Sequence, residues 1–572
     1  MTEEILRRPP ARESAARTYP HALPIVPVRA RGLTIEGADG RRYLDCLSGA
    51  GTLALGHNHP VVLAAIREVL DSGAPLHVPD LTTPVEDAFV TELLRTLPPG
   101  LADHARVRFC GPTGADALAT AYALARAATG RTAVLTFAGA DHGPGAETLK
   151  TSSTAIGLTD RPLPYPQDYR CPFGVGGPHG AELAGQWAEA VLNGADPAVP
   201  FPGDPAVPFP ADPGAPAPSA ALGAPAISPS AAPLAGMILE PVQGEEGVIP
   251  APDEWMRRMR HLTAARSVPL IVDESQTGVG RTGTFWAVEH SGVTPDVMIL
   301  SKAIGGSLPL AAVVHRDDLL DADAPDAHAG PFRGNQLAMA AGAATLAHVR
   351  HHRLAERAAT LGARLLKQLR VLRTEFAYVG DVRGRGLMIG VELVDPEAEA
   401  DTAAGAEAES RAARDGSGPS SVAAWGGGLA GVPLPHSSSD DATRTATGPF
   451  SARSPRPPAP HLASAVQREC LRRGLIVGLG GRNTSVVRLL PPLTISDEQV
   501  AAVLDRLADA LAAVAPAHTG RRQPRRDGDR QRNEEGRRRG EAQSQGHGRH
   551  RDPQHRPDQR CQEPGDSAGR AR

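Results

Sequence analysis

Two apolar runs end in charged side chains, where a buried strand would deliver them to a ligand crevice. In LIVDESQTGVGRTG (270–283) Asp273 and Glu274 end one run, and in DVMILSKAIGGSLPLA (296–311) Lys302 ends another; glycines follow both. The carboxyl ends of strands in an α/β sheet open onto such a crevice. A lysine shielded there has a lowered pKa and can act as a Schiff-base nucleophile. A nearby aspartate can keep a pyridinium nitrogen protonated, as pyridoxal phosphate requires. Either residue alone would be an ordinary charge, so the hypothesis rests on their conjunction.

The elements that must position these residues alternate between strand-like and helix-like patterns. Apolar runs typical of buried strands occupy 105–110, 132–137, 235–242, 268–274, 296–302 and 310–315. Helix-like stretches run from Ala115 to Ala128 and from Leu337 to Leu372. Shorter strand-like and helix-like segments follow at 384–393, 466–473, 475–479 and 486–493. Strands alternating with helices favour a parallel sheet. We therefore predict an α/β protein with a mostly parallel central sheet in a large domain and a smaller α+β domain.

Three segments are predicted to be disordered additions to this body. Residues 195–234 are rich in proline and alanine and repeat DPAVPFPG as DPAVPFPA, which is typical of an extended linker. Residues 397–460 and the arginine-rich tail 516–572 have too little apolar periodicity to form a core. The tail could attract phosphates, but acidic residues interrupt it and it has no aromatic residues to stack bases. We therefore do not expect a nucleic-acid partner, and an out-of-frame extension explains the tail equally well.

Composition and targeting patterns predict a cytoplasmic protein. The chain has 572 residues, 41% hydrophobic content and a net charge of −4, which together describe a globular protein. Its N-terminus, MTEEILRRPPARES, has no apolar signal region, and no run of about 18 apolar residues occurs, so no membrane association is expected. The cysteines lack disulfide or metal spacing, as in a reduced cytosolic chain. They are Cys46, Cys110, Cys171, Cys470 and Cys561.

Two further motifs are interpreted as structural. His57 and His59 in GHNHP have no third ligand or carboxylate cluster near them in sequence, so we predict no metal site there and assign them to a turn or cofactor wall. The glycines of GVGRTG and GRGLMIG lack the spacing of a dinucleotide-binding fingerprint, so neither NAD nor ATP is expected.

A set of longer motifs carries a resemblance to a known family. The motifs are YLDCLSGAGTLALGHNHP (43–60), RFCGPTGADAL (108–118), PYPQDYRCPFG (164–174), ILEPVQGEEGVIPAP (238–252), IVDESQTGVGRTG (271–283), LSKAIGGSLPLA (300–311), AHAGPFRGNQLAMAAG (327–342) and VVRLLPPL (486–493). With them the chain resembles the class III (ω-amino acid) pyridoxal-phosphate aminotransferases of fold type I. Within that class it most resembles the diaminobutyrate–2-oxoglutarate aminotransferases. The resemblance implies pyridoxal 5'-phosphate as cofactor and a homodimer.

The resemblance also implies roles for cofactor-binding residues. Lys302 would carry the cofactor and, once the amino donor frees it, move a proton between substrate and cofactor. Asp273 would bind the pyridine nitrogen, and Gln276 the ring hydroxyl. Thr113 and Gly114 would hold the phosphate, because they open the helix that starts near Ala115 and a helix N-terminus attracts anions.

Glu245 and Arg488 are implied to form a gate for the substrates. Arg488 matches the arginine that such enzymes use to bind a substrate carboxylate through a bidentate fork. Glu245 matches the glutamate that covers this arginine while an ω-amine reacts and releases it for 2-oxoglutarate. The same two residues, taken alone, are equally consistent with surface charges.

The chain departs from the family pattern at three positions. In AGADHGPG (138–145), Asp141 stands where an aromatic residue usually stacks on the pyridoxal ring, followed by His142. Pro331 replaces a threonine whose hydroxyl reaches the phosphate across the subunit interface, and Glu246 replaces a common glycine. A lost ring contact is worth about 0.5–1.5 kcal/mol and a lost hydrogen bond to a charged group about 1.5–3 kcal/mol. The cofactor is therefore expected to bind more weakly.

The sequence thus predicts an aminotransferase that moves the γ-amino group between L-2,4-diaminobutyrate and 2-oxoglutarate. Two alternatives stay open: an ω-aminotransferase for ornithine or 4-aminobutyrate, and a catalytically weakened binding protein of the same fold. The predicted domains are an N-terminal segment (1–60) that joins the small domain, a cofactor-binding domain (61–336) and a C-terminal small domain (337–515), followed by the tail.

Overall fold

The strand-like runs assemble into one large sheet in the computed structural model, which describes residues 23–78, 81–140, 157–158, 162–193, 233–319, 332–398 and 455–515. Seven strands follow the order β4-β12-β11-β10-β7-β5-β6. They are β4 (Ala105–Phe109), β12 (Ala312–Arg316), β11 (Val297–Leu300), β10 (Leu270–Asp273), β7 (Leu234–Leu239), β5 (Ala133–Leu135) and β6 (Gly157–Leu158). Of these seven described strands, β12 alone runs opposite to the other six. The prediction of a mostly parallel sheet is confirmed.

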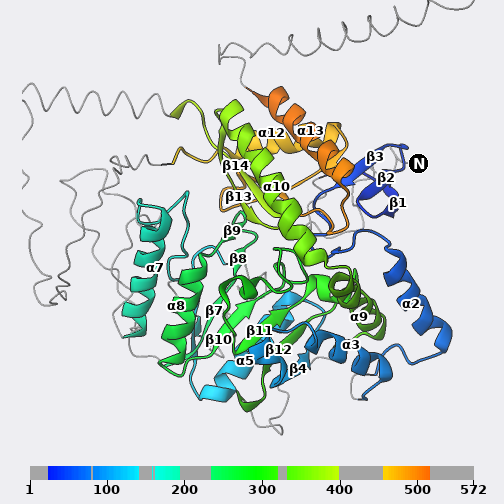
Figure 1. Ribbon diagram of the computed structural model, residues 1–572, viewed down its shortest axis with the longest axis vertical. Helices are drawn as coiled ribbons and strands as arrows, with labels where there is room; N and C mark the ends of the chain where they lie inside the picture. Colours follow the sequence, from blue (N-terminus) through cyan, green and yellow to red (C-terminus); the bar gives the residue numbers. More distant parts are fainter. Residues whose placement is uncertain are drawn as a thin grey trace, which may run out of the picture. The chain divides into compact units, whose positions relative to one another are not determined.

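Both faces of this sheet are buried, which explains the continuous apolar runs of its central strands. Side chains alternate between two hydrophobic cores, as the two-residue period of a strand requires. Ile271 of β10 and Ile299 of β11 lie in a core with helix α5 (Gly114–Thr129). Val272 and Leu300 lie in a larger core with helix α8 (Asp253–Ala264). Helix α7 (Gly177–Leu192) packs beside α8 (Figure 1).

A second, antiparallel sheet forms from the C-terminal segments in the order β13-β14-β17-β16. Its strands are β13 (Val379–Arg385), β14 (Met388–Leu393), β17 (Val486–Leu489) and β16 (Gly478–Gly480). Helices α10 (Leu354–Glu375) and α12 (Pro460–Arg472) pack on it, and α13 (Asp497–Val514) packs against both helices. The helical region expected from Leu337 to Leu372 is two helices, α9 (Gln336–His351) and α10. They are separated at Arg353, whose φ is +50°.

The N-terminal strands join a strand from the far end of the chain. β1 (Pro27–Arg31), β2 (Thr34–Gly37) and β3 (Arg42–Asp45) form an antiparallel sheet, and β15 (Leu475–Ile476) extends it in parallel with β3. The remaining elements are α2 (Pro60–Ser72), α3 (Pro84–Leu94), α4 (Pro99–Ala102), the β8 (Val242–Gln243) and β9 (Ile249–Pro250) hairpin, and the short helices η2 (Ala287–Ser291), η3 (Lys302–Gly305) and η4 (Asp317–Leu319).

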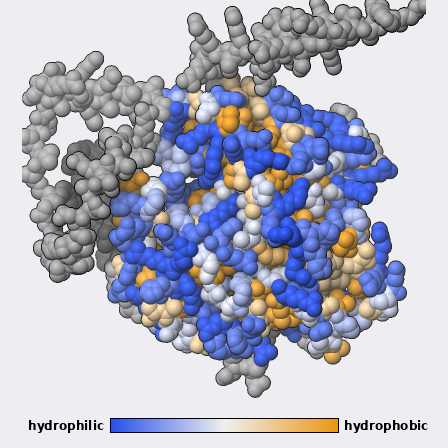
Figure 2. Space-filling view, viewed as in Figure 1, coloured by the Kyte–Doolittle hydropathy of each residue, from blue (hydrophilic) through white to orange (hydrophobic). Residues whose placement is uncertain are grey.

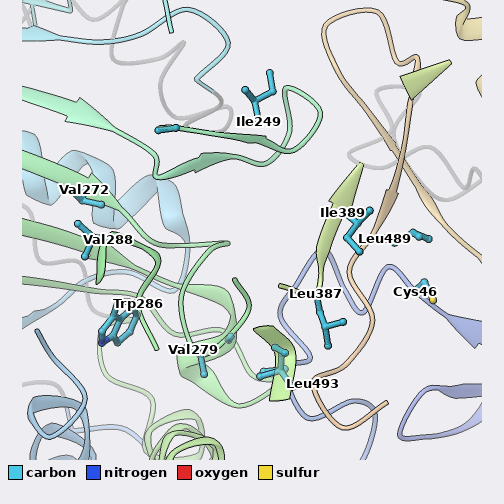
Figure 3. Close-up of a cluster of buried hydrophobic side chains, with 14 of the residues drawn as sticks. Cys46, Ile249, Val272, Val279, Trp286, Val288, Leu387, Ile389, Leu489 and Leu493 are labelled. Atoms are coloured by element: carbon cyan, nitrogen blue, oxygen red, sulfur yellow. The ribbon is translucent and has the colours of Figure 1, made fainter. Parts of the chain in front are cut away.

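One hydrophobic core links the two main sheets. Figure 3 shows buried side chains running from Val272 through Val279 and Leu493 to Ile389 and Leu489. The first belongs to β10 of the large sheet, and the last two belong to β14 and β17 of the C-terminal sheet. This shared core holds β17, which carries Arg488, in a fixed position relative to the strand ends of the large sheet.

The C-terminal boundaries predicted for the first two inserts are wrong, because ordered elements begin before both boundaries. Leu234, the last residue of the insert predicted at 195–234, already pairs with Ala133 as the first residue of β7. Pro458 forms a bridge with Val394, and α12 begins at Pro460, although both prolines fall in the insert predicted at 397–460. The proline-rich composition predicted disorder here, but backbone pairing with distant segments orders these residues. Most of both inserts and the whole tail 516–572 lie outside the described residues, and the described residues all belong to one compact unit, Met1–Ala515. The domain boundaries stay predictions.

The visible surface is predominantly hydrophilic, with hydrophobic residues scattered among charged ones (Figure 2). Within the described ranges, none of the helices has the length and apolar character needed to span a bilayer.

Candidate active site

Lys302 and Asp273 lie at the same edge of the large sheet. Strands β10 and β11 are parallel neighbours in which Asp273 pairs with Ile299, and Lys302 follows β11 as the first residue of η3. The backbone of Lys302 has φ +54°, a left-handed conformation that costs free energy in a non-glycine residue. Such strain persists only where the surroundings enforce it. The strand ends therefore bring together the two residues on which the sequence hypothesis depends.

The amine of Lys302 is poised to lose its proton more easily than an ordinary lysine. Burial lowers the pKa of Lys302, because a charged group loses hydration there, and the charge of Arg488 adds to this effect. The carboxylates of Glu245 and Asp273 oppose the shift without cancelling it. A lysine with a lowered pKa can act as a nucleophile and as a base near neutral pH.

Asp273 and its neighbour Glu274 have different environments. Asp273 accepts a hydrogen bond from the backbone N–H of Ser275 at 2.9 Å. Burial and the charge of Asp273 raise the pKa of Tyr122 in α5. Glu274 is buried, accepts from the N–H of Val288 at 2.8 Å, and has its pKa raised to about 7 by burial. Asp273 is only partly buried and its charge acts on Lys302, whereas Glu274 belongs to the protein interior.

Glu245 and Arg488 form an ion pair beside Lys302. Arg488 Nη2 lies 2.7 Å from Glu245 Oε2, and Arg488 is only 5% exposed. Gln276 donates from Nε2 to Glu245 Oε1 at 3.1 Å. Burial alone would raise the pKa of Glu245, but the Arg488 guanidinium and the hydrogen bonds from Arg488 and Gln276 outweigh it, so the pKa is lowered. Glu245 is thus held as a carboxylate that covers the arginine.

Gln276 is the centre of the contacts around this pair. Its Nε2 also donates to the carbonyl of Ala50 at 3.1 Å, and its Oε1 is buried without a partner among the described residues. A Cβ added to Gly244 would lie 1.7 Å from that oxygen, so only glycine fits there. Gln276 therefore contacts the loop that carries Glu245, and its predicted contact with a cofactor hydroxyl stays a prediction.

Thr113 and Gly114 open α5, as the sequence predicted for a helix start. Thr113 is the N-cap residue, and its N–H and Oγ1 both donate to Asp116 Oδ2, at 3.0 and 2.5 Å. The donors of Thr113 are thus already engaged within the protein. The first backbone N–H groups of a helix have no carbonyl partner inside the helix, so those of Gly114 and Ala115 remain suited to an anion.

Two predicted cofactor residues, Asp141 and His142, lie outside the described residues, as does Pro331. The chain that leads to Asp141 is described as far as Ala140. Gln243, the last residue of β8 and two residues before Glu245, donates from Nε2 to the carbonyl of Ala138 at 2.9 Å.

Sequence reasoning missed Gln243, which joins the Glu245 loop to the segment that precedes Asp141. A buried glutamine, 1% exposed, between two chemically important segments is visible only in the fold.

The two histidines of GHNHP make contacts within the protein. His57 Nε2 lies 2.8 Å from Asp45 Oδ2. The ring of His59 lies against that of His348 in an edge contact, with centroids 4.8 Å apart. The described part of the chain contains no cluster of three potential ligands able to hold a metal ion.

Comparison with known proteins decides the family. The family model of aminotransferase class III matches residues 14–172 and 225–416. The chain belongs to the class III aminotransferases. This aminotransferase is 43% identical to the diaminobutyrate–2-oxoglutarate aminotransferase of Rhizobium meliloti (strain 1021), over 89% of this chain and 91% of that protein. It is 36% identical to the Haemophilus influenzae protein of the same name, over 90% of this chain and 96% of that protein.

Solved structures agree with the fold of a class III aminotransferase. The PLP-bound amine transaminase of an uncultivated Pseudomonas species has a TM-score of 0.63 and 26% identity, covering 88% of this chain and 98% of that one. An (S)-enantioselective ω-transaminase from Thermomicrobium roseum has a TM-score of 0.61 and 26% identity, covering 86% and 93%. The molecule therefore has the fold type I architecture of the pyridoxal-phosphate transferases.

The cofactor of this class III aminotransferase is pyridoxal phosphate, and the described residues fit it. A buried lysine with a lowered pKa and an aspartate lie at one sheet edge. The hydroxyls of Ser275 and Ser301 are buried beside the start of α5 without partners in the described structure. Polar groups of this kind call for a ligand.

Proposed function

We propose that this aminotransferase moves the γ-amino group of L-2,4-diaminobutyrate to 2-oxoglutarate, giving L-aspartate 4-semialdehyde and L-glutamate in a reversible reaction. The observation that carries the proposal is the Glu245–Arg488 ion pair next to the buried Lys302. Support also comes from the relatives whose printed name is diaminobutyrate–2-oxoglutarate aminotransferase.

The ion pair explains how one pocket accepts two unlike substrates. The donor carries a cationic amine at its reacting end, so an uncovered Arg488 would repel it, and the Glu245 carboxylate neutralises that charge. 2-Oxoglutarate carries a second carboxylate, which can take the place of Glu245 on the guanidinium fork of Arg488. Gln276, already bonded to Glu245, positions the carboxylate in the covering state.

Lys302 and Asp273 provide the acid–base chemistry. Pyridoxal phosphate, when bound, supplies an electron sink for the carbon that carries the reacting amine. Asp273 would keep the pyridine nitrogen protonated. Lys302 Nζ would take the proton from the γ-carbon of the donor, which its lowered pKa favours. Thr113, Gly114, Asp141 and His142 are proposed to line the cofactor as the resemblance implies.

We also propose a cytoplasmic homodimer. Cys46 and Cys470 are buried thiols not joined in a disulfide, and burial raises the pKa of both, that of Cys470 to about 12. Buried reduced thiols suit a reducing compartment. The homodimer is supported by the family resemblance alone.

A panel of amino donors tests the substrate. Purified protein loaded with pyridoxal phosphate is incubated with 2-oxoglutarate and L-2,4-diaminobutyrate, L-ornithine, 4-aminobutyrate or 5-aminovalerate, and glutamate is measured. We expect the highest kcat/KM with diaminobutyrate and none in Lys302→Ala. A higher kcat/KM for another amine would identify that amine as the donor in place of diaminobutyrate. Retained cofactor without turnover of any amine would favour a binding protein of this fold.

A further inference from the structure

Two buried serine hydroxyls at the active-site edge have no hydrogen-bond partner in the described structure. Ser301 directly precedes Lys302 and is 4% exposed, and its Oγ is fully buried. Ser275 follows Asp273 by two residues, and its Oγ is buried as well. Buried hydroxyls are nearly always hydrogen-bonded, because desolvation without a partner is unfavourable. Two such groups at one place therefore indicate a ligand.

Both hydroxyls face the start of α5. A Cβ added to Gly114 would lie 3.2 Å from Ser301 Oγ and 3.8 Å from Ser275 Oγ. The ends of β10 and β11 and the first turn of a 16-residue helix thus meet around one small space. The helix start contributes backbone N–H groups and the positive end of its dipole, so the space favours an anion.

The donors of Thr113 do not complete this anion site. Its N–H and hydroxyl both donate to the carboxylate of Asp116, which also places a negative charge in the first helical turn. An anion at this place must therefore obtain its side-chain donors elsewhere. Ser275 and Ser301 are the described hydroxyls that lie close enough to Gly114 and are not already bonded.

We propose that Ser301 and Ser275 donate hydrogen bonds to the phosphate group of pyridoxal phosphate, and that Thr113 serves mainly to cap α5. This inference rests on the proposed function, since it assumes the cofactor at Lys302. It assigns the phosphate to side chains on the same strand ends that carry Lys302 and Asp273. Ring chemistry and phosphate anchoring are then set by the same two strands.

The test compares two probes, pyridoxal phosphate and pyridoxal, which lacks the phosphate. Apoenzyme of the wild type, Ser301→Ala and Ser275→Ala is titrated with each probe, and binding is followed by absorbance. Each substitution should lower the affinity for pyridoxal phosphate about 10- to 100-fold, as expected for a lost hydrogen bond to a charged group. Binding of pyridoxal should not change.

Ser291→Ala is the matched control. Ser291 is also 4% exposed, but its Oγ donates to the carbonyl of Val288 at 2.7 Å. This variant should bind both probes like the wild type. A second readout is thermal stability. Removing an unpartnered hydroxyl should leave the melting temperature of the apo form of Ser301→Ala unchanged or higher, whereas the gain from adding pyridoxal phosphate should shrink.

Equal weakening of both probes would show that the serines act structurally and would overturn the inference, as would unchanged binding of both. These outcomes leave the proposed function standing, because the wild type still takes up pyridoxal phosphate at Lys302. If the wild type bound neither probe, the proposed function and the inference would fail together.

Discussion

The charges around Lys302 oppose one another, and their balance sets the chemistry. Glu245 and Asp273 favour the ammonium form, while burial and Arg488 favour the neutral amine and prevail. Glu245 also covers Arg488, so it acts on both the base and the substrate-binding group. The residue is therefore the point where a single substitution should separate the two half-reactions.

Glu245→Gln should change the KM values for the two substrates in opposite directions. Without the carboxylate, Arg488 keeps its charge exposed, so KM for diaminobutyrate should rise about 10-fold and KM for 2-oxoglutarate should fall. Steady-state kinetics with each substrate varied separately measures both constants. Glu246→Gln, which removes the neighbouring carboxylate, is the control and should leave the ratio of the two constants unchanged. A parallel change in both constants would contradict the gate.

Glu274 predicts a pH dependence of stability that is separate from catalysis. Its pKa in the folded protein is about 7, above the ordinary value of 4.5, so folding favours the protonated form. Its contribution is complete below about pH 4.5 and is lost as the pH rises through 7. Glu274→Gln should remove a decline of about 3 kcal/mol over this interval, since one pKa unit corresponds to about 1.4 kcal/mol, and urea unfolding at several pH values measures it. Glu254→Gln, on an exposed helix face, should retain the decline.

At the scale of elements, helix α9 holds the backbone around Lys302. A Cβ at Gly342 in α9 would lie 2.1 Å from the carbonyl oxygen of Ile304, within η3. A Cβ at Gly306 would lie 2.3 Å from the carbonyl oxygen of Ala341. Glycine is thus required on both sides of this contact. The close approach holds α9 against η3, the helix that begins at Lys302.

Gly342→Ala should destabilise the protein although alanine favours helix. The helix gains about 1 kcal/mol, but forcing α9 away from η3 costs about 1–3 kcal/mol and disturbs the many side chains packed between them. We expect a net loss of stability in urea unfolding and a lower kcat. The control is Gly185→Ala in α7, where the nearest atoms belong to the flexible side chain of Arg258. Equal effects of the two substitutions would contradict a special role for the α9 contact.

Sequence patterns predicted some elements and residues well, for physical reasons. Asp273 and Lys302 were recognisable because charged residues end fully apolar strands, and a doubly covered sheet produces such runs. Ser275 and Ser301 could not be recognised in the sequence, because serine is common in any loop. What distinguishes them is a buried hydroxyl without a hydrogen-bond partner in the described structure, which only the fold reveals. Gln276 was expected at the cofactor, but its contacts with Ala50 and Glu245 depend on long-range packing that a single sequence does not encode.

At the scale of the whole molecule, residues distant in sequence complete one site. Arg488 on β17 reaches Glu245 because one hydrophobic core joins the two main sheets (Figure 3). In the N-terminal sheet, Ile476 of β15 likewise pairs with Asp45 of β3. The sequence pattern predicted the strands themselves. It could not predict which distant strands and side chains meet, because several strand arrangements would bury the same apolar runs.

The arginine-rich tail is predicted to be dispensable. A variant that ends at Ala515 should keep kcat/KM and the solution mass of the full-length protein, because Leu507 and Leu511 of α13, 0% exposed, complete the core before that point. The full-length chain has a mass of 59.6 kDa. If the proposed homodimer is right, light scattering should give twice the mass of one chain for both proteins. A variant that ends at Ile495 removes α13 and should not fold. Loss of activity in the first variant would assign the tail a role.

The most direct test of the account follows the transferred nitrogen. L-2,4-diaminobutyrate carrying a heavy-nitrogen label at its γ position is incubated with 2-oxoglutarate and the holoenzyme, and glutamate is analysed by mass spectrometry. The account predicts that glutamate acquires the label, that a label at the α position is not transferred, and that Lys302→Ala transfers neither. Label from the α position in glutamate, or unlabelled glutamate from the γ-labelled donor, would contradict it.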